Sequence, residues 1–114
     1  MQLKKTAFWI AALALTTMSL MPTDFLPQQV FSLWDKAQHA LGFAGLTLLG
    51  LLAYPQHRVW VPVLLLVLGG AIELAQAATG WRQGDWIDFL ADAIGIAATL
   101  SLWWSQAGRR SRSA

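Results

Sequence analysis

Four long apolar runs are the feature that most limits what this chain can fold into. They cover about residues 6–21, 36–54, 59–78 and 86–104, and each approaches the ~20 residues that a helix needs to cross a bilayer. Pro22 and Pro55 close the first two runs, TGWRQGD closes the third, and a basic tail over 105–114 follows the fourth. We therefore predict an all-α membrane protein, one domain over residues 1–114, with a bundle of four transmembrane helices.

Composition supports this class. Hydrophobic residues make up 56% of the 114 residues, and seven residues are Trp, which is more apolar surface than so short a soluble domain can bury. The chain has no Cys, which excludes disulfides and thiolate catalysis. A net charge of +2, without basic residues interleaved with aromatic ones, gives no support for binding nucleic acid.

The basic residues predict an orientation. With four spans, one side of the membrane holds most of them, and the opposite side holds two. Cytoplasmic loops carry the excess of Lys and Arg, so both termini are predicted to be cytoplasmic. The majority side has Lys4, Lys5, Arg58, Arg109, Arg110 and Arg112, against Lys36 and Arg82. Lys4 and Lys5 before a short apolar run also fit a signal peptide, but no Ala-x-Ala site follows, and we expect the first helix to be retained.

Polar residues gather in the predicted outer halves of the helices. Asp85, Asp88 and Asp92 have the spacing of one helical stripe, which Gly95 extends. Two further stripes pair polar with small residues: Glu73 and Gln76 with Gly69, and Asp35, Gln38 and His39 with Gly42 and Gly45. Small residues mark close approaches between membrane helices, so we expect the three stripes to face one another.

Several kinds of chemistry fit these residues. Glu73, Asp88 and Asp92 suit acid–base work, or with His39 they suit a divalent cation, the one cofactor that we consider. The alternative is a structural polar network with Lys36 and Arg82 as counter-charges.

Two residues near the predicted helix ends have their own alternatives. Asp85 suits a helix cap as well as a ligand. Arg82 suits an anionic headgroup as well as a plain surface position. Binding residues are predicted to be Asp35, Lys36, His39, Glu73, Gln76, Arg82, Asp85, Asp88 and Asp92, with His39, Glu73 and Asp88 as candidates for catalysis.

The order of these short motifs resembles the VanZ-like proteins, which are small integral membrane proteins of bacteria. The matching residues are Asp35-Lys36-x-x-His39, Glu73-x-x-Gln76, Gly80-x-Arg82, Asp88 and Gly95. The family pattern reads D-K-x-x-H, E-x-x-Q and G-R, then D-x-x-x-N-x-x-G. Two positions depart from it: Trp81 separates Gly80 from Arg82, and Asp92 replaces the usual Asn. The additional carboxylate either raises the demand for a cation or leaves one acid protonated.

The resemblance implies a multi-pass protein of the bacterial cytoplasmic membrane, of about four or five helices. Its founding member is linked to teicoplanin (glycopeptide) resistance. We expect the polar site to bind a lipid-linked cell-wall intermediate, a lipoglycopeptide or another anionic envelope component among the membrane lipids. An intramembrane enzyme, with Asp35 or Glu73 orienting His39 as base, and a subunit that pairs with a protein partner both stay open.

Overall fold

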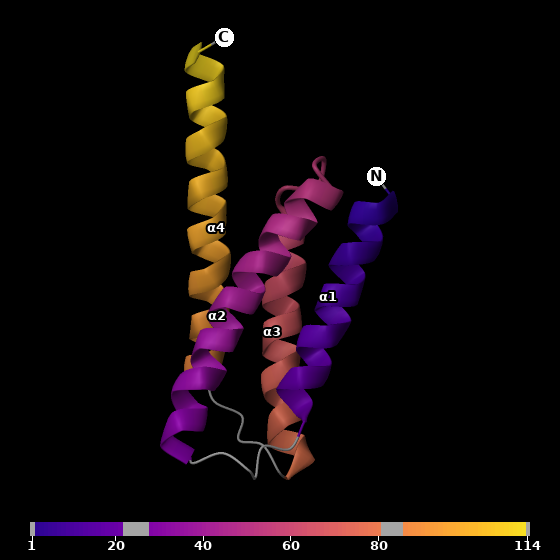
Figure 1. The fold of residues 1–114 in the computed structure, drawn as a ribbon, viewed down its shortest axis with the longest axis vertical. Helices are drawn as coiled ribbons and strands as arrows, with labels where there is room; N and C mark the ends of the chain where they lie inside the picture. The colour runs from indigo at the N-terminus through magenta and orange to yellow at the C-terminus, as the bar shows by residue number, and fades with distance from the viewer. Residues whose placement is uncertain (1, 22–27, 81–85, 114) are drawn as a thin grey trace.

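The computed structural model describes residues 2–21, 28–80 and 86–113, and within these ranges the chain forms four α-helices and no strand. The helices are α1 (Gln2–Leu20), α2 (Gln28–Ala53), α3 (Trp60–Thr79) and α4 (Trp86–Ser113). They run alternately up and down, so the N-terminus, the α2–α3 connection and the end of α4 lie at one end (Figure 1). The all-α prediction is confirmed.

The boundaries of α3 have local causes. Pro62 lies in its first turn, where the missing N–H has no helical partner to lose. Gly80 ends the helix with φ of 80°, a left-handed conformation that glycine adopts without steric cost.

Two other boundaries differ from the prediction. Helix α2 begins at Gln28 and not near Lys36, so Asp35 lies inside the helix and does not open it. Helix α4 continues to Ser113, so the stretch from 105, predicted as a basic tail, is helical almost to the end of the chain. The segment added to α4 is polar, whereas the segment added to α2, QQVFSLWD, mixes polar with apolar residues. Both contain good helix formers, such as Gln and Leu in α2 and Gln and Arg in α4, and an unbroken apolar run marks only the middle of such a helix.

Helix α2 occupies the centre of the packing. Its most extensive contact is with α4, where Thr99 Oγ1 donates to the carbonyl oxygen of Ala44 at 3.1 Å. It also contacts α1 and α3, whereas α1 and α4 do not meet within the described ranges. Helices α1 and α4 are therefore joined through α2 and α3.

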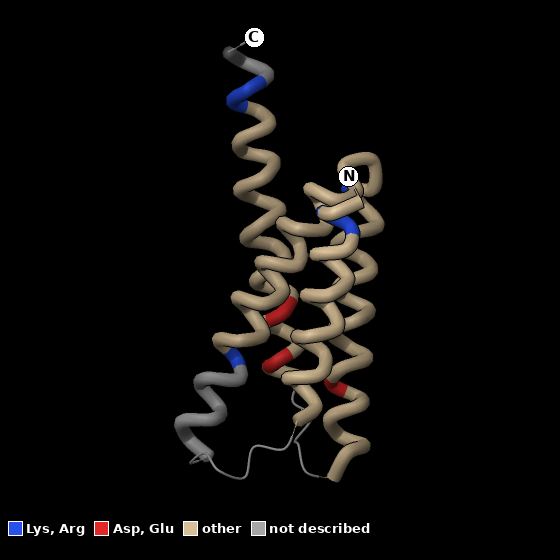
Figure 2. Tube along the Cα trace, turned by 45° about the vertical axis from the view of Figure 1, so that its right-hand side comes forward, with Lys and Arg blue, Asp and Glu red and all other residues tan. Residues whose placement is uncertain are grey.

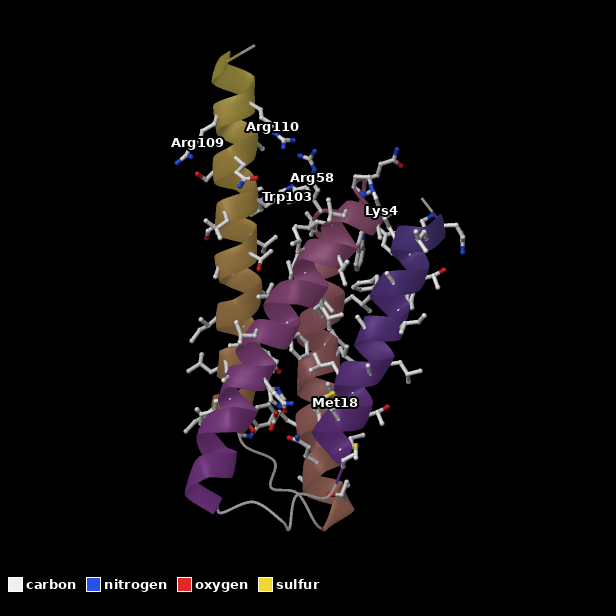
Figure 3. The ribbon with its side chains drawn as sticks, in the orientation of Figure 1. Lys4, Met18, Arg58, Trp103, Arg109 and Arg110 are labelled. Carbon is white, nitrogen blue, oxygen red and sulfur yellow. The ribbon has the colours of Figure 1, made fainter. Side chains whose placement is uncertain are left out.

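The end of the bundle that holds the N-terminus has an apolar core and charged groups outside it. Phe8, Leu51 and Val61 are buried there, and a Cβ on Gly50 would lie 2.6 Å from Val61 Cγ1. Lys4, Arg58, Arg109 and Arg110 project from this end (Figure 3). We call it the basic end.

The lateral surface of the bundle is apolar. Each helix exposes large hydrophobic side chains, for example Ile10 (62%), Leu41 (74%), Val67 (65%) and Leu90 (57%). Two segments, Trp60–Thr79 and Trp86–Arg110, are long and apolar enough to cross a membrane, with only 33% and 22% of their most apolar windows buried inside the protein. A core helix of a soluble protein would turn such residues inward.

Hydroxyl groups on this surface bond to their own helices. Thr16 and Thr17 donate to the carbonyl oxygens of Ala12 and Leu13, each at 2.8 Å, and Thr6 donates to Gln2 at 3.0 Å. Such bonds from residue i to i−4 satisfy the hydroxyl without water. The side chains along α1 are therefore compatible with an apolar surrounding.

Candidate functional site

Three helices bring buried polar side chains together in the half of the bundle away from the basic end. His39 comes from α2, Glu73 and Gln76 come from α3, and Asp88 and Asp92 come from α4. None of the five exposes more than 3% of its surface. Figure 2 shows the three acidic positions in this half, opposite the basic residues of the other end. We call these five residues the polar cluster.

The shortest contact in the polar cluster joins α2 to α4. His39 Nδ1 lies 2.6 Å from Asp92 Oδ1, and these side chains are exposed by 1% and 0%. An ionised Asp92 only accepts, so Nδ1 then carries the hydrogen and donates it. The ring of His39 also stacks on Phe43, one turn along α2, at 6.3 Å between centroids and 6° between planes. The imidazole is therefore held both at its edge and on its face.

Glu73 completes a group of three possible ligands. One ligand atom from each of His39, Glu73 and Asp92 lies within 4.8 Å of the other two, and all three residues are buried. The i and i+3 spacing of Glu73 and Gln76 puts both on the inward face of α3. The three stripes therefore meet as the spacing predicts.

Gln76 connects the polar cluster to α1. Its Nε2 donates to the carbonyl oxygen of Ser19 at 2.8 Å, while the Ser19 hydroxyl donates to Leu15. The amide oxygen Oε1 is buried and has no hydrogen-bond partner among the residues that the structure describes. The sequence analysis missed Ser19, because its hydroxyl gives no sign that its backbone carbonyl receives a bond from another helix.

Lys36 and Asp88 form an ion pair at the rim of the polar cluster. Lys36 Nζ lies 3.8 Å from Asp88 Oδ1, and the two side chains are 31% and 4% exposed. Lys36 is thus one of the counter-charges that the sequence predicts. Lys and Arg have long side chains that carry their charge outward, which suits Lys36 to the edge of a buried site.

Glycines allow the helices to approach at the polar cluster. A Cβ on Gly69 would lie 2.7 Å from Asp92 Oδ2, and a Cβ on Gly95 would clash with the Ala40 carbonyl oxygen. Gly42 is also close-packed, with Leu15 Cδ1 at 2.8 Å from its Cβ position. Gly45 is exposed, and nothing in the described ranges comes within 4 Å of its Cβ position, so the prediction of a packing role for it is wrong.

Some predicted residues are not placed with the others. Asp35 belongs to α2, but its side chain is not among those described. Arg82 and Asp85 lie outside the described residues, which leaves their predicted roles as predictions. His39 contacts Asp92, which was not predicted to orient it, and the predicted orienting role of Asp35 or Glu73 stays a prediction.

The polar cluster has two chemical capacities. A histidine held by a carboxylate can accept or donate a proton, and the oxygen and nitrogen atoms of three side chains can hold a cation. Comparisons with protein-family models, with curated proteins and with solved structures give no match.

Proposed function

We propose that all four helices span the bacterial cytoplasmic membrane and that both termini are cytoplasmic. Support comes from the apolar lateral surface, from the internally bonded hydroxyls and from the basic end. Among the described residues, Lys36 is the one Lys or Arg at the opposite end. The excess of Lys and Arg marks the cytoplasmic side.

This topology is testable because the chain has no Cys. Single cysteines replace Gln56, between α2 and α3, and Gln83, between α3 and α4. In intact cells a membrane-impermeant maleimide is expected to label position 83 and not position 56. Labelling of position 56 in intact cells, with position 83 protected, would reverse the orientation.

The polar cluster, in this proposal, binds an anionic or lipid-linked component of the cell envelope. The observation that carries the proposal is the burial of His39, Glu73, Gln76, Asp88 and Asp92 in one half of an otherwise apolar bundle. Ionisable groups at membrane depth cost roughly 2.5–3.5 kcal/mol each on insertion scales, and where they occur they usually serve a ligand or a transport path. Lys36 at the rim supplies a positive charge for the ligand.

The VanZ-like resemblance belongs to the same proposal. It favours a ligand such as a lipid-linked cell-wall intermediate or a lipoglycopeptide, and with it a contribution to teicoplanin resistance. All five residues of the polar cluster carry the resemblance or its departure: His39, Glu73, Gln76 and Asp88 match the family pattern, and Asp92 departs from it.

Native mass spectrometry of gently extracted protein tests this function. We expect a co-purifying phosphate-bearing lipid on the wild type and its loss in Glu73→Ala. Tyr54→Phe, at the basic end, is the matched control and is expected to keep the lipid. Equal lipid occupancy in wild type and Glu73→Ala would contradict binding at the polar cluster.

A second function is favoured by the contact between His39 and Asp92. At 2.6 Å, the carboxylate orients the imidazole as it does in a general base, so the polar cluster also suits an intramembrane enzyme that acts on a lipid-linked substrate. His39→Gln is then expected to retain lipid binding and lose turnover of extracted lipid substrates. Loss of binding and turnover together would leave His39 as a binding residue.

A further inference from the structure

The proposed ligand and the proposed site carry charge of the same sign. The polar cluster holds three carboxylate side chains within one buried region, and an anionic headgroup would enter beside them. Like charges in a region of low dielectric repel strongly. Lys36, at the rim, pairs with Asp88. The described residues therefore suggest a cationic bridge between the acids and the ligand.

We infer that His39, Glu73 and Asp92 bind one divalent transition-metal cation. Their ligand atoms lie within 4.8 Å of one another. Ligand atoms around one such ion, with bonds of about 2.0–2.2 Å, lie roughly 3–4 Å apart, so small side-chain rotations bring the three to bonding distance. All three side chains are almost wholly buried, which excludes the solvated acidic patches that gather on protein surfaces without an ion.

The types of donor select the cation. One imidazole nitrogen and two carboxylate oxygens suit Mn²⁺, Fe²⁺ or Zn²⁺ better than Mg²⁺ or Ca²⁺, which favour sites made only of oxygen. Asp88 is excluded from the set because it faces Lys36 at 3.8 Å. Three protein ligands leave coordination positions for water or for a ligand's oxygen, as in catalytic metal sites.

Gln76 provides an independent observation. It is 0% exposed, it lies one turn from Glu73 on the same face of α3, and its Oε1 has no hydrogen-bond partner among the described residues. A buried amide oxygen without a donor is costly. A water molecule on the cation, one turn away, supplies that donor.

The cation also indicates which class of ligand the polar cluster binds, and this assignment rests on the proposed function. Its open positions accept oxygen atoms of a phosphate or pyrophosphate, so acids that would repel such a group instead hold it through the metal. The substrate class is then a lipid with a phosphate or pyrophosphate headgroup. The metal site itself does not depend on this step.

Mn²⁺ binding to the purified chain in a neutral detergent tests the metal site. Bound Mn²⁺ loses the sharp six-line electron paramagnetic resonance signal of the free ion, so the titration gives stoichiometry and affinity. We expect one Mn²⁺ per chain, displacement by Zn²⁺ and a nitrogen coupling from His39 in pulsed spectra. Wild type that binds no more Mn²⁺ than a Glu73→Gln, Asp92→Asn double variant would overturn the inference.

Conservative variants separate ligands from neighbours. Glu73→Gln and Asp92→Asn are each expected to weaken Mn²⁺ binding by about 10-fold or more, and His39→Gln is expected to remove the nitrogen coupling. Asp88→Asn removes the same charge nearby and is expected to weaken binding by only about 3-fold, since it loses a field and not a ligand. If Asp88→Asn weakens Mn²⁺ binding as much as Glu73→Gln and Asp92→Asn do, the general negative charge of the region holds the cation, and not three specific ligands.

Arg82 provides the decisive comparison, since the sequence names it as a counter-charge. If Arg82→Ala binds Mn²⁺ and the wild type does not, the Arg82 guanidinium takes the position inferred for the cation, and the inference fails.

Binding of a phosphate-bearing lipid, extracted from vesicles by the protein, is measured separately, once with Mn²⁺ and once with a chelator. Mn²⁺ binding without any lipid binding would contradict the proposed function alone, whereas lipid binding that ignores Mn²⁺ would contradict the bridge.

Discussion

The two ends of the bundle differ in where their charged side chains lie. At the basic end, Lys5 lies 5.2 Å over the ring of Tyr54, and Trp9 Nε1–H donates to the Tyr54 hydroxyl at 2.9 Å, both beside a pocket of about 460 Å³. These groups surround an apolar core. At the other end three described acids, Glu73, Asp88 and Asp92, are buried between the helices, with Lys36 at the rim, and large apolar side chains such as Leu41 and Leu90 are exposed.

This difference indicates that the two ends have different roles: the basic end positions the bundle, and the other end carries the candidate site. Amphipathic side chains such as Trp and Tyr favour membrane interfaces, with one part in lipid and one in water, so in the proposed topology they would orient the bundle at little energetic cost. Buried ionisable groups need matched partners on other helices. Substitutions at the polar cluster should therefore change the free energy of unfolding far more than substitutions at the basic end.

Removal of the Asp92 carboxylate should have the largest effect. Asp92→Ala leaves His39 Nδ1 buried without its acceptor, and breaking a buried pair in this way costs about 3–5 kcal/mol. Thermal unfolding in detergent, followed by circular dichroism, measures it. Asp92→Asn keeps an oxygen acceptor and should lose roughly half as much; equal losses would mean that charge, and not the hydrogen bond, matters.

The next largest effect is expected at the close approach of α2 and α4. Gly95→Ala places a Cβ in steric clash with the Ala40 carbonyl oxygen, so the helices must separate, at a cost of about 2–3 kcal/mol. Gly45→Ala is the control: its Cβ position is open among the described residues, and alanine favours helix by up to ~1 kcal/mol. Destabilisation by both variants, measured by the same unfolding assay, would contradict this picture.

Gln76 should show an intermediate effect. Gln76→Leu removes the bond to the Ser19 carbonyl oxygen but keeps side-chain volume, and a lost hydrogen bond in a buried site costs about 1–2 kcal/mol. Hydrogen exchange of the last turn of α1 should rise more than exchange in α2. A uniform rise across all helices would show that Gln76 does not specifically fix α1.

The smallest effect belongs to the basic end. Tyr54→Phe removes the bond from Trp9 but leaves a ring under Lys5, and the loss should be about 0.5–1 kcal/mol. Unfolding of this variant beside Asp92→Ala compares the two ends directly. A loss as large as that of Asp92→Ala would remove the distinction between them.

Sequence periodicity predicted which faces of the helices meet, and it did so because helical spacing fixes a face before any packing occurs. His39, Glu73 and Asp92 were placed on facing stripes and do converge. Periodicity does not fix rotation or height between helices, so it did not single out the contact between His39 and Asp92.

Other features had weaker signals. The start of α2 at Gln28 precedes the unbroken apolar run, in a stretch that mixes polar with apolar residues, so the run alone does not locate it. Gln76 donates its hydrogen bond to a backbone carbonyl oxygen, which every residue has, so no residue type in the sequence indicates the acceptor. Gly45 shares its spacing with Gly42, and only the arrangement of neighbouring helices shows that one is packed and the other is not.

Helix α4 joins both ends in one unbroken rod. Its 28 residues extend about 42 Å, whereas the hydrocarbon layer is ~30 Å thick, so its last turns, with Arg109 and Arg110 exposed, project past the other helices (Figure 3). Asp88 and Asp92 sit near the start of that rod. If a ligand at the polar cluster tilts α4, a spectroscopic label at Ser105 would therefore report the tilt without altering Asp88 or Asp92.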